Sequence, residues 1–258
     1  MSHHADSMGY HAALAALAWQ VELGVETCVL DAPVNRYETP EKPEKPAAPV
    51  TPQAAPQAAP VVQAVDVVAE AEAMAAAAPD LEALRAAMDA YPHCELRKGA
   101  RNLVFADGVP GARVMVVGEA PGRDEDREGK PFVGRAGQLL DRMLGAIDLS
   151  RSDTVYITNV LPYRPPQNRD PRPEEIAMML PFLKRHIALA QPELLLIMGN
   201  ISCQALLGKR GITRLRGTWA EAAGKPALPM FHPAYLLRNP AAKREAWADL
   251  LSVQARLA

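Results

Sequence analysis

Four short apolar runs, each ending in a polar turn, constrain the fold of this chain more than any other feature. Short apolar runs bounded by turn residues are typical of buried strands. The runs are Val114–Val117 before Gly118–Gly122, Thr154–Thr158 before Asn159, Leu194–Met198 before Gly199-Asn200, and Leu228–Phe231 before His232. Their similar ends indicate strands that deliver polar groups to loops.

Helical patterns alternate with these runs. Apolar residues at helical spacing share a face over 139–147, and two further helices are expected over 174–190 and 201–207. A last helix is expected over 241–257, with Trp247, Leu250, Leu251 and Val253 facing inward. Alternating strands and helices favour a parallel sheet with right-handed crossovers. We therefore predict an α/β fold: a three-layer α/β/α domain with a mainly parallel four-stranded central sheet and an N-terminal helical appendage.

The chain divides into three parts by composition. Residues 1–31 form an N-terminal helical segment, with a helix over 9–26 whose Leu14, Leu17 and Val21 share a face. Residues 32–63 form a Pro/Ala-rich linker, which we expect to be disordered. Residues 64–258 form the α/β domain with a leading helix over 64–90. Amphipathic helices usually pack on a domain, so we expect this of the first helix; the alternative is a peptide that binds a protein partner.

Charge is unevenly distributed along the 258 residues. Residues 1–91 carry a formal net charge of −9 and residues 92–258 one of +7. A basic domain favours a polyanionic partner, although many domains carry a few excess arginines.

Cysteine spacing and hydropathy exclude several classes of protein. The three cysteines (Cys28, Cys94 and Cys203) form no CxxC pair, so neither a disulfide framework nor a zinc site is indicated. No apolar run reaches the roughly 18–20 residues of a membrane span, and no secretory signal is evident. We expect a reduced, cytoplasmic monomer that does not bind membranes.

Polar side chains at the ends of the predicted strands point to one site. Ligands of open parallel sheets bind outside the carboxyl ends of the strands, where Glu119, Asn159 and His232 would meet. Taken singly, Asn159 is explained by turn capping and His232 by a surface position. The glycine-rich stretch 118–137 matches neither GxGxxG nor GxxxxGK[ST], the usual phosphate-binding patterns. The convergence of three functional groups favours catalysis.

Several separated motifs together resemble one known family. They are GEAPG at 118–122, KPFVGRAGQLL at 130–140, YITNVLPYRPPQNRDPRPEEI at 156–176 and FHPAYLLR at 231–238. In this order and spacing they are similar to family 4 of the uracil-DNA glycosylase superfamily. The resemblance covers roughly residues 92–250 and neither the first helix nor the linker.

The resemblance implies how a base would be bound. Phe132 would stack on an extruded uracil, and the Asn159 amide would read its O4 and N3–H, a pattern that cytosine reverses. The Ala120 backbone N–H would add a contact. His232 would lie beside uracil O2 and stabilise the departing anion.

The resemblance also implies groups for water and for DNA. Glu119, with Asn168 and Glu125 as further candidates, would position or activate water. The alternative role for Glu125 is to exclude the methyl group of thymine. Leu236 or Leu237 would fill the vacated base stack. Arg238 would reach a phosphate or the orphaned base. Further phosphate contacts are expected from Arg164, Arg169, Arg214 and Arg216, each of which alone is more often a solvated charge.

The chain departs from the family pattern at the iron–sulfur ligands. Family 4 members usually hold a [4Fe–4S] cluster through four cysteines, and only Cys94 matches here. The other positions read Tyr91, Tyr163 and Met179. One thiolate cannot hold a four-iron cluster, so we predict a protein with no cofactor and no metal, in which these side chains fill the volume by packing.

The implied function is a monofunctional uracil-DNA glycosylase that hydrolyses the N-glycosidic bond and leaves an abasic site in DNA repair. The segment 162–173 has no histidine and no insertion, so a covalent product is not expected. The chain has no conspicuous lysine nucleophile, and this absence argues against a coupled lyase activity. Two alternatives remain: a binding protein for uracil-containing or abasic DNA with little turnover, and a nucleoside or nucleotide N-glycosidase.

Overall fold

A computed structural model describes residues 10–22 and 66–258, which form two units that we treat separately. The first holds α1 (Tyr10–Glu22), a helix that exposes Tyr10, Leu14, Leu17 and Trp19. The linker predicted over 32–63 and the side chain of Val21 lie outside the described residues. None of the described helices combines the length and apolar character that crossing a bilayer requires.

The second unit is built on a six-stranded sheet with the strand order β1-β3-β2-β4-β6-β5. The central four strands are parallel, as predicted, and each edge strand is antiparallel to its neighbour. The two edge strands were not predicted, since two or three residues give no readable alternation. The strands are β1 (Asp107–Gly108), β2 (Val114–Gly118), β3 (Val155–Asn159), β4 (Leu194–Met198), β5 (Ala220–Ala222) and β6 (Lys225–Met230).

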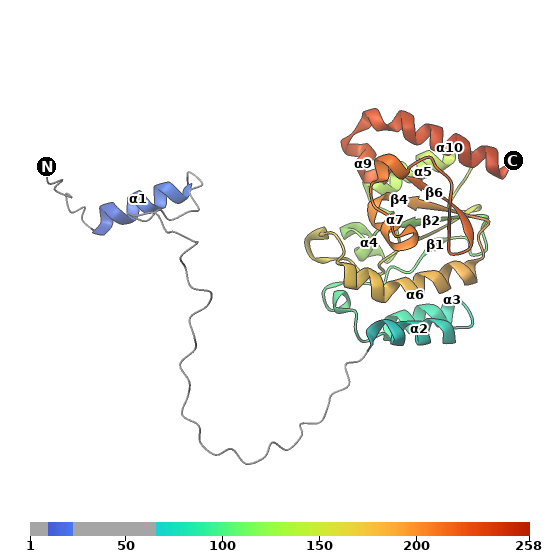
Figure 1. Cartoon of the computed structure of the whole chain (residues 1–258), viewed down its shortest axis with the longest axis horizontal. Helices are drawn as coiled ribbons and strands as arrows, with labels where there is room; N and C mark the ends of the chain where they lie inside the picture. The colour runs from blue at the N-terminus through green and yellow to red at the C-terminus, as the bar shows by residue number, and fades with distance from the viewer. Residues whose placement is uncertain (1–9, 23–65) are drawn as a thin grey trace, which may run out of the picture. The chain divides into compact units, whose positions relative to one another are not determined.

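Helices cover both faces of this sheet, which confirms the three-layer α/β/α prediction (Figure 1). α5, α9 and α10 lie on one face and α6 lies on the other. α2 and α3 pack against the outer side of α6 as a further layer. The helices are α2 (Val67–Ala77), α3 (Leu81–Ala90), α4 (Arg123–Glu128), α5 (Arg135–Gly145), α6 (Pro173–Ala190), α7 (Gly199–Leu207), α8 (Ile212–Leu215), α9 (Pro233–Arg238) and α10 (Lys243–Leu257).

The leading helix predicted over 64–90 is two helices, and the break lies at Pro79-Asp80. Proline disfavours helical backbone at the residue before it, so α2 ends at Ala77. The carboxylate of Asp80 then accepts the N–H of Ala83 over 2.8 Å and caps α3.

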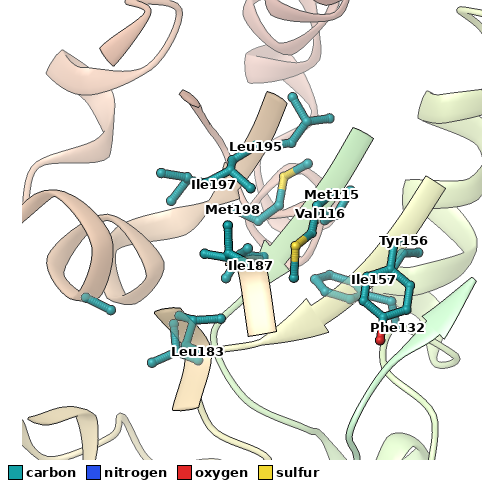
Figure 2. Packing of buried hydrophobic residues seen from close by; sticks show 14 of the residues in the cluster. Met115, Val116, Phe132, Tyr156, Ile157, Leu183, Ile187, Leu195, Ile197 and Met198 are labelled. Carbon is teal, nitrogen blue, oxygen red and sulfur yellow. The ribbon is translucent and has the colours of Figure 1, made fainter. Parts of the chain in front are cut away.

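The core lies between the sheet and its helices. All five residues of β2, β3 and β4 are buried, as expected for parallel strands covered on both faces. Figure 2 shows strand side chains such as Met115 and Met198 in the same buried cluster as Leu183 and Ile187 of α6.

The inward face of α10 was only half correctly predicted. Leu250 and Val253 are buried, but Trp247 and Leu251 are each 43 % exposed. Asp249 takes an inward position instead, because its carboxylate pairs with Arg216. A buried ion pair on this helix is invisible to a hydrophobic pattern.

Candidate active site at the carboxyl ends of the strands

A cavity of about 520 Å³ opens where the four parallel strands end. Phe132, Asn159 and His232 all line it, although they are far apart in the sequence. The structure therefore brings together the three side chains expected to surround a base. Other predicted residues at its walls are Glu119, Ala120, Glu125, Asn168, Arg169 and Arg238.

Gly118 brings the ring of Phe132 and the amide of Asn159 together. It is paired with Asn159 across the ends of β2 and β3. A methyl group at Gly118 would lie 2.3 Å from Asn159 Oδ1 and 2.5 Å from Phe132 Cε2. Only glycine leaves room for both groups, which explains the first residue of GEAPG.

Glu125 hydrogen-bonds to backbone groups of this site. Its carboxylate accepts N–H groups from Gly122 over 3.1 Å, Val133 over 3.1 Å and Gly134 over 2.9 Å. Both oxygens are engaged, and they join the GEAPG turn to the loop that carries Phe132. The structure thus adds a loop-positioning role for Glu125 that was not predicted, while its two predicted roles, water activation and exclusion of a methyl group, remain predictions.

His232 precedes α9 and caps that helix. Its Nδ1 accepts the N–H of Ala234 over 3.2 Å, and its ring is stacked with that of Phe132 at 5.4 Å between centroids. Gly199, with φ of +91°, leaves space for it, because a Cβ there would lie 3.2 Å from that of His232. Burial, and to a lesser degree the positive charge of Arg238, lowers the pKa of His232 to about 4. The imidazole is therefore neutral at pH 7.

Glu119 is a carboxyl group that is partly protonated and partly ionised near neutral pH. Burial raises its pKa to about 7; the negative charge of Asp170 adds to this shift and the positive charge of Arg210 opposes it. Asp170 and Arg210 lie 3.7 Å apart and also line the cavity. A carboxyl group with a pKa near 7 suits proton transfer.

The predicted polar residues of the 164–169 segment lie at the rim. Asn168 is exposed, and its Oδ1 accepts from Arg164 Nε over 2.7 Å. Arg169 makes a two-point ion pair with Glu175, over 2.6 and 2.9 Å. These bonds hold the segment at the cavity, while the predicted contacts with water and phosphate remain predictions.

The predicted DNA-contacting side chains differ in accessibility. Leu236 is 1 % exposed and belongs to the core, so it cannot be the wedge. Leu237 is half-buried and Arg238 is exposed, so both can reach DNA. Arg216 pairs with the buried Asp249 and lies over the ring of Phe231, which corrects its assignment as a phosphate clamp. Arg214 is exposed.

Sequence reasoning missed three charged residues of this region: Arg151, Asp170 and Arg210. The last two line the cavity. Arg151 does not line the cavity but hydrogen-bonds to the backbone of the loop that carries Phe132. All three stand in loops with no periodicity, and Arg151 and Arg210 lie outside the recognised motifs, so only the fold reveals their positions.

The residues at the cluster positions do not fit an iron–sulfur cluster. Tyr91, Tyr163 and Met179 are all buried, as is Cys94. Tyr91 Oη donates to the carbonyl of Val67 over 2.6 Å, and Tyr163 Oη donates to Asp89 over 3.0 Å. Burial raises the pKa of the Cys94 thiol. Within 66–258, no three His, Cys, Asp or Glu side chains are grouped as metal ligands would be.

Comparison with known proteins gives a consistent family. The profile of the Uracil DNA glycosylase superfamily matches residues 105–251. A Type-4 uracil-DNA glycosylase of Thermotoga maritima is 42% identical over 149 residues, which span 57% of this chain and 77% of that protein. Its counterpart from Archaeoglobus fulgidus is 40% identical over 169 residues, 62% of this chain and 84% of the relative. That of Sulfurisphaera tokodaii is 39% identical, with coverages of 62% and 77%.

Proposed function

This chain belongs to the uracil DNA glycosylase superfamily, and we propose that its cavity removes uracil from DNA by hydrolysis. The supporting observation is the grouping of Phe132, Asn159 and His232 around one hollow at the ends of the parallel strands. Each of these groups matches one requirement of the reaction. The product would be free uracil and an abasic site.

Base recognition is assigned to Phe132 and Asn159. A uracil that leaves the duplex loses its stacking partners, and the face of Phe132 restores part of that interaction. The Asn159 side chain is only 5 % exposed, and it lines the cavity. Its NH₂ would donate to O4 and its carbonyl would accept from N3–H. Cytosine would leave both groups of the buried amide unpaired, which is costly.

Bond cleavage is assigned to His232 and Glu119. As the bond between C1′ and N1 breaks, its electron pair stays on the base and negative charge builds on O2. Because Nδ1 of His232 already accepts a hydrogen bond, the proton of the neutral ring lies on Nε2, and this N–H donates a hydrogen bond to O2 of the uracil anion as it leaves. Water then attacks C1′, and the ionised Glu119 takes its proton.

Contacts with DNA are assigned to side chains at the rim of the cavity. The half-buried Leu237 would enter the space that the base vacates, and Arg238, with Arg164 and Arg214, would contact phosphates. A wedge beside the cavity favours DNA over a free nucleoside. A cytoplasmic location, a monomeric state and a protein partner for α1 remain predictions.

One assay separates this proposal from its alternatives. The protein is incubated in EDTA with single- and double-stranded oligonucleotides that carry one uracil, and abasic sites are cleaved with alkali. Repeated turnover that falls at least a hundredfold in Asn159→Ala supports the enzyme, and His93→Gln, which lies outside the site, serves as a control. Tight binding without strand breaks would support a binding protein, and release of uracil from deoxyuridine alone would support a nucleosidase.

A further inference from the structure

Arg151 lies in the turn before β3 and binds the backbone of the loop that carries Phe132. Its Nη2 donates to the carbonyl of Phe132 over 2.7 Å, and its Nη1 donates to the carbonyl of Pro131 over 3.2 Å. The side chain is only 20 % exposed. The guanidinium thus reaches the loop from the side away from the cavity, which it does not line.

Two carboxylates fix this guanidinium. Nε donates to Asp141 of α5 over 2.8 Å, and Nη1 also donates to Asp107 of β1 over 3.0 Å. All three nitrogens are therefore engaged, by two acids and two backbone carbonyls. Only the planar fork of arginine offers this many fixed donors.

The backbone of Phe132 needs such support. Its φ is +54°, a left-handed value that a residue with a bulky side chain rarely adopts. The loop also lies against α5, since a Cβ on Gly137 would come within 1.7 Å of the Phe132 carbonyl oxygen. Unfavourable backbone conformations persist only where the surroundings enforce them. Here Arg151 holds the carbonyls of residues 131 and 132, while Glu125 holds the N–H groups of residues 133 and 134.

We propose that Arg151 is a positioning residue, which acts on the reaction by holding the ring of Phe132 where it stacks on the extruded base. The inference rests on the proposed function. Arg151 does not contact the base, so its whole effect passes through Phe132. Loss of the guanidinium lets the loop leave its left-handed conformation and takes the ring away from the cavity.

Binding of an uncleavable substrate tests this role. The probe is an oligonucleotide with 2′-fluoro-2′-deoxyuridine, whose glycosidic bond resists hydrolysis, and its Kd is compared with that of the same strand carrying thymidine. Arg151→Gln is expected to reduce this preference about tenfold, a loss similar to that of a stacked base. Arg185→Gln is the matched control, because Arg185 also binds a backbone carbonyl, that of Ala78, but far from the cavity.

A double-mutant cycle distinguishes positioning from general stability. In a Phe132→Ala background, Arg151→Gln should change the preference less than twofold, since the ring through which it acts is absent. If Arg151→Gln does not fold, Arg151→Lys, which keeps the charge beside Asp107 and Asp141, is carried through the same cycle. Equal losses in both backgrounds, or no loss in either, would overturn the inference. A wild-type protein that releases no uracil would instead refute the proposed function.

Discussion

The N–H of Ala234 donates to Nδ1 of His232 over 3.2 Å, and this bond determines which ring nitrogen carries the proton that is available for catalysis. It holds the neutral ring with its proton on Nε2. Since the pKa of His232 is lowered to about 4, the same tautomer is present throughout the physiological range. His232 is thus a fixed hydrogen-bond donor rather than a titrating acid.

Removal of this donor should slow excision by about a hundredfold or more, because one preorganised donor to a developing anion contributes a few kcal/mol. Single-turnover rates of His232→Ala and wild type on a uracil oligonucleotide measure the effect. Their ratio should stay constant from pH 6 to 9. A ratio that titrates near pH 6.5 would show that the imidazole is charged in the working enzyme.

Glu119 predicts the pH dependence of the reaction. A carboxylate that accepts a proton from water must be ionised, and burial raises the pKa of Glu119 to about 7. The value of kcat/KM should therefore rise between pH 6 and 8, and this rise should be absent in Glu119→Gln. A profile unchanged by the substitution would remove Glu119 from the proton transfer.

The same pKa has a consequence for stability. Between the ordinary value of 4.5 and about 7, the folded protein binds more protons at Glu119 than the unfolded chain does. The free energy of unfolding should therefore fall as the pH rises through this range, by on the order of 1–3 kcal/mol. Denaturant unfolding at pH 5 and pH 8 measures this fall, which should be smaller in Glu119→Gln. An equal fall in both proteins would argue against the raised pKa.

Gly118 should tolerate no side chain. A Cβ there meets Asn159 and Phe132 at 2.3–2.6 Å, so Gly118→Ala must displace at least one of the two groups assigned to the base. We expect a loss of excision of tenfold or more, measured as kcat/KM. Gly145→Ala is the control, since a Cβ at Gly145 has no neighbour within 4 Å. Normal activity of Gly118→Ala would mean that the loop yields readily.

Iron should be absent from the purified protein. Tyr91 and Tyr163 are buried and hydrogen-bonded where the family has cysteines. We expect no broad absorbance near ~400 nm and no loss of activity with chelators. Stoichiometric iron would contradict the prediction of an iron-free protein.

Tyr91→Phe should lower the free energy of unfolding by about 1 kcal/mol, because it loses the bond to the Val67 carbonyl. Denaturant unfolding of the variant and the wild type measures this difference.

The parallel centre of the sheet could be predicted because each of its strands is a short apolar run with a clear end. The same pattern placed Glu119, Asn159 and His232 at one edge, where the structure has them. The edge strands β1 and β5 could not be found, since so few residues carry no period. The break at Pro79-Asp80 comes from the proline and the capping aspartate, which a pattern of apolar spacing does not report.

The wrongly predicted inward face of α10 and the unpredicted backbone contacts of Glu125 share one physical cause. Periodicity reports how apolar a face is, and it does not report which polar side chains are buried in pairs. Asp249 and Arg216 therefore displaced Trp247 and Leu251 from the expected inward face of α10. Likewise, the three backbone hydrogen bonds of Glu125 depend on loop geometry that no spacing encodes. The motif identifies Glu125 as a candidate, but only the folded structure shows which backbone groups it holds.

The layer formed by α2 and α3 sets where an autonomous version of the domain can begin. Ala71, Ala75 and Leu84 are almost completely buried against the rest of the unit. The Arg185 side chain also binds the carbonyl at the end of α2. A truncated chain starting at Pro92 would uncover an apolar strip along α6 and become prone to self-association, whereas one starting at Asp66 would retain its own cover.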